Sequence, residues 1–320
     1  MLKLKSVVAC LLASGFTASV MAADIVKVGV FTVSSSLPYF VALERGYFKE
    51  VDIETQMTPF AASSLTLQAM VSEQIEAASN LVALEAANIN ARRPGTTFYL
   101  SVNGQSQQYK MEQFIVPKGS TAKTIKDLKG GRLFSAPGPG NVGAAKAVLK
   151  ANGLVEGRDY TMQEQQMGVH VGALQSGNFD GGYTLEPMAT IAQKQGVGQL
   201  LEAGVISTYL IGRKDALAYA SGGVVSGKFL AERPAVAARY AAAWAKAVRD
   251  INNDPKVRVY LVKHLNTSGE IAPTVPLPKF TMIKDLRPVD YVDFQKFIDV
   301  AVENGIIKDK IDVKTIVKAF

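Results

Sequence analysis

Four short stretches of this sequence combine hydroxyl, amide or glycine residues with the start of a predicted helix. They are "SSSLPY" at 34–39, "FAASS" at 60–64, "SNLVA" at 79–83 and "APGPGNVG" at 136–143, and none contains a basic residue. A helix N-terminus presents unpaired N–H groups and the positive end of the helix dipole, so it binds anions without arginine. The stretches therefore predict a site for a small anion, or for a neutral polar solute, because hydroxyl and N–H groups serve both. Taken singly, each stretch is also explained by helix capping and turn formation.

The groups expected at this site are short polar side chains and glycine backbone, with two tyrosines and a carboxylate nearby. In chain order the predicted binding residues are Ser35, Ser36, Tyr39, Ser63, Ser64, Ser79, Asn80, Gly140, Asn141, Val142, Tyr183 and Glu186. The tyrosines would add a flat wall or a phenol donor, although either one is also explained as a packing residue. Glu186 precedes a proline, and such a pair more often starts a helix than contacts a ligand.

Residues suited to catalysis or to metal binding are scarce. The chain has two histidines, His170 and His264, and one cysteine. His170 is at the start of a predicted helix, where we expect a surface or capping role. The sequence contains no Cys/His set for zinc, no G-x-S-x-G turn and no G-x-x-x-x-G-K-[ST] phosphate loop. We therefore expect a binding protein, with no catalytic residue, no metal and no cofactor.

Gly138, Gly140 and Gly143 have the G-x-G-x-x-G spacing of a dinucleotide-binding loop, between a predicted strand and a predicted helix. In such a site an Asp or Glu follows about 20 residues later, at the end of the next strand. Asp159 is near that distance but precedes the strand predicted at 160–167. We therefore interpret the loop as a cradle in which the backbone comes close to a small ligand.

The composition is that of a packed globular protein rather than of a nucleic-acid-binding one. Of the 320 residues, 48% are hydrophobic and 20% are charged, and the formal net charge is +7. The basic residues are scattered among acidic ones, with no stripe of arginine and aromatic residues. The length suffices for two lobes of roughly 100–200 residues each.

The first 23 residues have the pattern of a secretory signal peptide. Lys3 and Lys5 precede the apolar stretch "SVVACLLASGF", and small residues precede a predicted cleavage after Ala22 or Ala23. Cys10 lies in this segment, so the mature chain would have no cysteine and no disulfide. Lipidation of Cys10 is disfavoured, since only a few residues separate it from Lys5. No later apolar run reaches the ~20 residues of a membrane-spanning helix.

The elements that position these stretches form two series of alternating strands and helices. In the first, at 24–110, a helix starts near Pro38 and ends at Gly46, and the alternation predicts a mostly parallel sheet. The second series begins near Gln113 and is smaller. After about residue 205 we expect strands at 204–212 and 221–230, then a long helix from Pro234, then further helices with a proline-rich connection.

Four segments resemble, in the same order, the periplasmic solute-binding proteins of ABC importers, in the nitrate/sulfonate/taurine-binding branch. They are "PYFVALERGYFKEVDIE" at 38–54, "PKGSTAKTIKDLKGGRLFSAPGPG" at 117–140, "ALQSGNFDGGYTLEPMATIAQKQG" at 173–196 and "VVSGKFLAERPAVAARYAAAWAKAV" at 224–248. The chain departs from the family pattern before Val51, where the usual glycine is missing, and its last 50 residues match no segment of the family.

This resemblance implies an α/β protein with the two-lobed periplasmic binding protein type II fold and a ligand in the inter-lobe cleft. The lobes would close on the ligand like a hinge. The implied organisation is a signal peptide at 1–23, the first part of lobe 1 at 24–110, lobe 2 at 111–210, and a return to lobe 1 with C-terminal helices at 211–320.

The resemblance also implies a function in import. A periplasmic monomer would capture a small organic anion (a sulfonate, taurine or a nitrate-like solute) and deliver it to the transmembrane permease subunits of an ABC transporter with a cytoplasmic ATPase. A binding-only relative of this fold carries thiamine-related pyrimidines, so a neutral or aromatic heterocycle is the alternative ligand. A secreted enzyme is the third and least favoured hypothesis.

Overall fold

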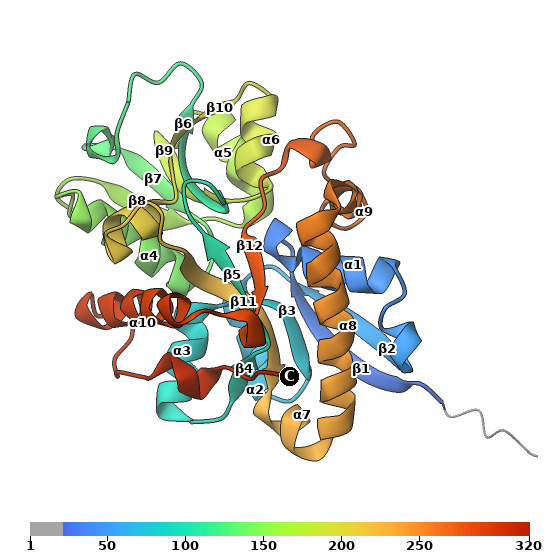
Figure 1. Cartoon of the computed structure of the whole chain (residues 1–320). Coiled ribbons are helices and arrows are strands. Elements are labelled where there is room, and N and C mark those ends of the chain that lie inside the picture. The colour runs from blue at the N-terminus through green and yellow to red at the C-terminus, as the bar shows by residue number, and fades with distance from the viewer. Residues whose placement is uncertain (1–21) are drawn as a thin grey trace, which may run out of the picture.

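The computed structural model describes residues 22–320, which form two lobes, each built around its own sheet (Figure 1). The predicted signal peptide lies outside the described residues except for Ala22 and Ala23. Helices pack against both sheets, so the predicted two-lobed α/β fold is confirmed.

Lobe 1 is built on a seven-stranded sheet in the order β12-β5-β11-β3-β1-β2, with β4 paired to β11. Its strands are β1 (Asp24–Phe31), β2 (Ile53–Phe60), β3 (Ala77–Val82), β4 (Thr97–Tyr99), β5 (Ser101–Gln105), β11 (Ala218–Ser226) and β12 (Lys279–Met282). β1 is parallel to β2 and β3, whereas β11 is antiparallel to β3, β4 and β5. The prediction of a mostly parallel arrangement is confirmed for the strands within residues 24–110, because β1 to β5 all point in the same direction. β11 and β12, which come from later in the chain, run in the opposite direction.

The helices of lobe 1 cover both faces of this sheet (Figure 1). They are α1 (Leu37–Glu44), α2 (Ser63–Val71), α3 (Ala83–Arg92), α7 (Gly227–Glu232), α8 (Pro234–Asn253), α9 (Tyr260–Leu265) and α10 (Pro288–Glu303). α8 starts at Pro234 as predicted and packs against α1. It buries Trp244, whose Nε1 donates a hydrogen bond to Ser101 Oγ at 2.9 Å.

The last residues of the chain also belong to lobe 1. The sequence pattern does not predict β12; its four residues form a strand because β5 lies beside them. Near the C-terminus, Lys318 N–H donates to Tyr99 O at 2.8 Å and so fastens the end of the chain to β4.

Lobe 2 is built on a five-stranded sheet in the order β10-β6-β9-β7-β8. Its strands are β6 (Glu112–Pro117), β7 (Arg132–Ser135), β8 (Thr161–Glu164), β9 (Gly181–Leu185) and β10 (Gly198–Ala203), and its helices are α4 (Pro139–Ala151), α5 (His170–Gln175) and α6 (Met188–Lys194). All of these elements fall within residues 111–210.

The chain passes from lobe 1 to lobe 2 through residues 106–111 and returns through residues 204–217. The strand predicted at 204–212 is wrong: Ile206–Ile211 form a π-helix. Contacts from both lobes hold this helix, because Ile206 N–H donates to Glu112 Oε1 at 3.1 Å and Ser207 Oγ donates to Gln105 O at 2.8 Å. Short π-helical segments are frequent at functional sites.

The two passages touch at Gly204. Its φ is +64°, and a Cβ built on it would lie 2.2 Å from the backbone nitrogen of Gln107. A side chain here would therefore push the two inter-lobe passages apart, and glycine is the residue that allows both the backbone angle and the contact.

We expect Gly204→Ala to lower the free energy of unfolding by roughly 3 kcal/mol or more, because it adds a backbone overlap to an unfavourable φ. Gly212→Ala is the matched control: Gly212 has φ +87°, and a Cβ built on it would meet no atom within 4 Å. We expect that variant to lose only about 1 kcal/mol. Urea unfolding measures both values, and equal losses would contradict a tight contact at Gly204.

Candidate ligand-binding site

A small cavity lies between the lobes, beside both inter-lobe passages. Its lining comes from both lobes and consists of Ser35, Asn80, Val82, Gln105, Met111, Gly140, Asn141, Ala144, Tyr183, Leu185, Ile206, Ala220, Ser221 and Phe297. The cavity offers about 20 Å³ to the centre of a water molecule, which is room for about one water. The two lobes therefore pack against each other and leave only this small space between them.

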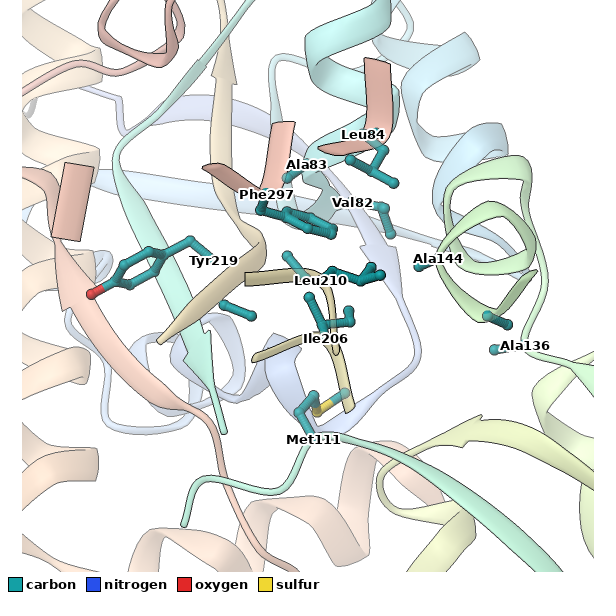
Figure 2. Packing of buried hydrophobic residues seen from close by; sticks show 14 of the residues in the cluster. Val82, Ala83, Leu84, Met111, Ala136, Ala144, Ile206, Leu210, Tyr219 and Phe297 are labelled. Carbon is teal, nitrogen blue, oxygen red and sulfur yellow. The ribbon is translucent and has the colours of Figure 1, made fainter. Parts of the chain in front are cut away.

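Apolar side chains from every part of the interface form one wall of this cavity. Figure 2 shows Met111 from the first passage, Ile206 from the second, Val82 and Ala144 from the two lobes, and Phe297 from α10 gathered together. These residues belong to one continuous cluster of buried side chains that spans both lobes. The wall suits a flat or apolar part of a ligand.

The polar wall contains hydrogen-bonding atoms without protein partners. Ser35 Oγ and Gln105 Oε1 are both buried and make no hydrogen bond. Asn80 is held from behind, since its Oδ1 accepts from Asn103 Nδ2 at 2.8 Å. Asn103 Nδ2 also approaches Ser221 Oγ at 3.2 Å. A ligand is the natural partner for the unpaired atoms, because an unsatisfied buried polar group costs about 1–3 kcal/mol.

Five of the predicted binding residues lie on the cavity: Ser35, Asn80, Gly140, Asn141 and Tyr183. They come from three of the four stretches identified in the sequence, together with β9. Asn141 Nδ2 donates to Pro137 O at 2.7 Å, so this side chain also closes the turn before α4.

The remaining predicted serines lie near the cavity without lining it. Ser36 Oγ donates to Phe31 O at 2.6 Å and lies 2.8 Å from Ser79 Oγ, so both hydroxyls hold the start of α1 against β3. Ser63 Oγ accepts from Val82 N–H at 2.9 Å. Ser64 is half-buried beside the loop that precedes α4.

Two other predicted residues, Tyr39 and Val142, make contacts within their own lobes. Tyr39 is buried in the core of lobe 1 against Phe48, and its hydroxyl lies 3.0 Å from Thr55 Oγ1, so it does not line the cavity. Val142 is half-buried, and its N–H donates to Gly138 O at 3.1 Å. The sequence pattern shows that a residue lies near a helix start, but not which side of the helix it faces.

Glu186 acts at the contact between the lobes rather than on the cavity wall. Its carboxylate accepts from Gln113 Nε2 and from Thr190 N–H, the latter at 3.2 Å, which caps the start of α6. Its backbone oxygen accepts from Ser34 N–H of lobe 1 at 3.0 Å. Ser34 Oγ also donates to Met111 Sδ at 3.3 Å.

His170 is fully buried, so the predicted surface or capping role is wrong. Its Nδ1 lies 2.7 Å from Thr184 Oγ1 and its Nε2 lies 3.1 Å from Gln165 O. Burial lowers the pKa of His170 to about 4, so the ring is neutral at pH 7. Within residues 22–320, no group of three or more His, Cys, Asp and Glu residues could hold a metal ion, and no helix is both long and apolar enough to cross a membrane.

Sequence reasoning missed two buried carboxyl groups beside the cavity, Glu85 and Glu112. Each has one oxygen without a hydrogen-bond partner. Burial raises the pKa of Glu85, of Glu112 and of Glu186 to about 7 in each case. The signal available in the sequence was a single acidic residue inside an apolar run, as in "LVALEAA" at 81–87. No Lys, Arg or His is among the residues that line the cavity.

These raised pKa values predict that stability falls as pH rises. The pKa of Glu112 is about 7 in the folded chain, against an ordinary value of 4.5 for a glutamate in water, so between these values the folded state binds more protons than the unfolded state. Its stabilising contribution is complete below pH 4.5 and is lost as pH rises through 7.

Between about pH 5 and pH 8.5 the free energy of unfolding of the wild type should fall as Glu112 loses its proton. We expect this fall to be roughly 2 kcal/mol smaller in Glu112→Gln. The amide oxygen of glutamine can still accept from Ile206 N–H. His170 shifts stability in the opposite direction, but it is present in both proteins and cancels in the comparison. Urea unfolding across this pH range is the measurement, and identical pH slopes would contradict a buried, proton-binding Glu112.

Solved structures with the same architecture include solute-binding proteins. A ligand-binding component of an ABC-type import system from Staphylococcus aureus has a TM-score of 0.73 at 13% identity, covering 92% of this chain and 97% of its own. The alkanesulfonate-binding protein SsuA from Xanthomonas axonopodis pv. citri, bound to MOPS, has a TM-score of 0.73 at 17% identity, with 93% and 100% covered. The periplasmic nitrate-binding protein NrtA from Synechocystis PCC 6803 has a TM-score of 0.71 at 14% identity, with 92% and 86% covered.

At these identities the likeness establishes the fold. Among curated proteins, none matches the sequence. The family profile described as "NMT1/THI5 like" matches residues 34–257, a span that contains the start of α1, all of lobe 2, both passages and α8. The chain therefore belongs to the NMT1/THI5-like family and has the solute-binding fold of ABC-type import systems.

Proposed function

We propose that the mature chain is the periplasmic solute-binding component of an ABC importer. It captures a small solute between its lobes as a monomer and delivers it to transmembrane permease subunits that work with a cytoplasmic ATPase. Support comes from the family, from the fold shared with proteins of import systems, and from a cavity placed where two lobes meet.

We propose further that the solute is a small neutral, donor-rich heterocycle, such as an amino-substituted pyrimidine related to thiamine. The observation that carries this is the set of unpaired atoms beside the cavity: Gln105 Oε1, Glu85 Oε2 and Glu112 Oε2 are all acceptors when the carboxyl groups are ionised. A ligand with N–H groups satisfies them, and the apolar wall with Phe297 accommodates a ring.

A small anion is the second candidate, because Ser35 and the start of α4 line the cavity. The anionic group of a sulfonate, of taurine or of nitrate brings acceptor oxygens to a site whose unpaired atoms are mostly acceptors. No cationic side chain on the lining offsets the charge, and three carboxyl groups are buried nearby. These features favour the neutral solute.

A binding function accounts for both histidines without catalysis. His170 is buried and bonded within lobe 2. His264 Nε2 lies 2.9 Å from Glu44 Oε1, and its ring stacks on Phe40 with centroids 4.3 Å apart. Both are structural parts of their lobes.

Two measurements test the ligand class. Native mass spectrometry of the purified mature protein identifies any solute that copurifies. Calorimetric titration with pyrimidines, sulfonates, taurine, nitrate and carboxylates then ranks the classes. We expect an amino-substituted pyrimidine to bind most tightly; saturable binding of a sulfonate or nitrate with no response to any pyrimidine would overturn the proposed ligand.

We expect Ser35→Ala to weaken binding of the solute roughly 3- to 10-fold, the value of one neutral hydrogen bond. The melting temperature of the ligand-free variant should not fall, because Ser35 Oγ makes no hydrogen bond within the protein.

Ser36→Ala is the matched control one position along the chain. It removes the bonds to Phe31 O and Ser79 Oγ, so it should lower the melting temperature and leave affinity nearly unchanged. The reverse pattern, with affinity lost in Ser36→Ala alone, would exclude Ser35 as the ligand-facing hydroxyl.

A further inference from the structure

The carboxylate of Glu85 reaches from lobe 1 to the start of a helix in lobe 2. Glu85 is in the first turn of α3 and only 6% of its surface is exposed. Its Oε1 accepts a long hydrogen bond, 3.5 Å, from Gly140 N–H in the first turn of α4. Its Oε2 is buried and has no hydrogen-bond partner. The Ser63 hydroxyl adds a second interaction that favours the charged carboxylate.

The glycine-rich loop before α4 is shaped around this carboxylate. A Cβ on Gly138 would lie 2.8 Å from Glu85 Oε1. A Cβ on Gly140 would lie 3.4 Å from the same oxygen and 2.6 Å from Val82 Cγ1. Gly138 also has φ +97°, which disfavours a side chain. Two of the three glycines whose spacing suggested a cradle for a ligand thus form a cradle for a side chain of the other lobe, whereas the third, Gly143, lies against Ile306.

The position that Glu85 occupies is where an anion would bind. α4 is 13 residues long, and its first N–H groups carry the positive end of the helix dipole. Pro139 supplies no N–H, so Gly140 is the first free donor of the helix. A solute anion directed at the same N–H group would meet an ionised carboxylate at hydrogen-bonding distance, and two like charges cannot share it.

We propose that Glu85 is the resident anion of this cleft: its carboxylate occupies the anion-binding start of α4, joins the lobes without a solute, and makes the cleft reject anionic solutes. This inference rests on the proposed function in one respect, that the cleft binds a solute. It names the residue that sets the charge of the solutes the cleft accepts.

The test removes the carboxylate of Glu85 by substitution and measures whether an anion added in solution binds in its place. In Glu85→Ala the lost group corresponds to acetate, so acetate and nitrate are titrated by calorimetry at pH 8, with ionic strength held constant by a salt of a bulky anion. We expect both anions to bind the variant at least tenfold more tightly than the wild type.

The matched control is Glu164→Gln. Glu164 is an exposed residue on β8 whose negative charge raises the pKa of Glu85, so it is near enough to act on the same site. Its substitution removes a charge but leaves the cradle filled, and anion affinity should stay within about twofold of the wild type. An equal gain in this control would show that overall charge, and not Glu85, governs anion binding.

A folded Glu85→Ala with no gain in anion affinity would overturn the proposal, as would a wild type that binds nitrate as tightly as the variant. If Glu85→Ala does not fold, Glu85→Gln replaces it, since it keeps the shape and removes the charge. We then expect about a threefold gain for nitrate, and a folded Glu85→Gln without any gain overturns the proposal too.

This experiment is independent of the identity of the natural solute. A gain of anion binding in the variant, with no pyrimidine bound by the wild type, would leave the role of Glu85 intact and refute the proposed ligand. Pyrimidine binding by the wild type, with no gain of anion binding in the variant, would support the proposed ligand and refute the role of Glu85.

Discussion

The contact between the two inter-lobe passages is the constraint on which the rest of this structure depends. The chain leaves lobe 1 through residues 106–111 and returns through 204–217, and Gly204 lets the two backbones touch. The return passage then winds into a π-helix whose first N–H group binds Glu112. Met111 and Ile206, one from each passage, form part of the apolar wall of the cavity. The same residues therefore connect the lobes and form part of the cavity wall.

Desolvation decides the chemistry of the cleft. Three carboxyl groups near the cleft are buried away from water, and the pKa of each is raised because the charged form loses its hydration. Hydrogen bonds replace part of the lost hydration: Glu186 accepts one from the first turn of α6, and Glu85 accepts one from the first turn of α4. A cleft of this kind is poorly suited to a further negative charge, although its hydroxyls and amides resemble those expected of an anion site. The charges beside the lining matter as much as the groups on it.

The lobes are held closed by few polar contacts and a large apolar one. Ser34 N–H with Glu186 O, and Gly140 N–H with Glu85, join lobe 1 to lobe 2 directly. The buried side chains in Figure 2 belong to one apolar cluster that includes residues of both lobes. Under the proposed function, entry of a solute larger than water separates these groups, so its affinity depends on how well it replaces the contacts between them.

The sequence by itself determined the local elements and their order. Pro38 and Gly46 marked the first helix, Pro234 marked α8, and the alternating segments on either side of residue 111 indicated two α/β lobes, because caps and periodicity act over a few residues. The sequence also identified five residues, near helix starts or in a strand, that the structure brings onto one cavity: Ser35, Asn80, Gly140, Asn141 and Tyr183.

The tertiary structure decided which hydroxyl faces that cavity. Ser35 Oγ has no hydrogen-bond partner, whereas Ser36 Oγ is bonded to Phe31 and Ser79. The tertiary structure also decided the π-helix at 206–211 and β12. It likewise decided the contact of Glu85 with Gly140, which lies 55 positions later in the chain. Burial and partners across two lobes fix these features, and no pattern within a single segment records them.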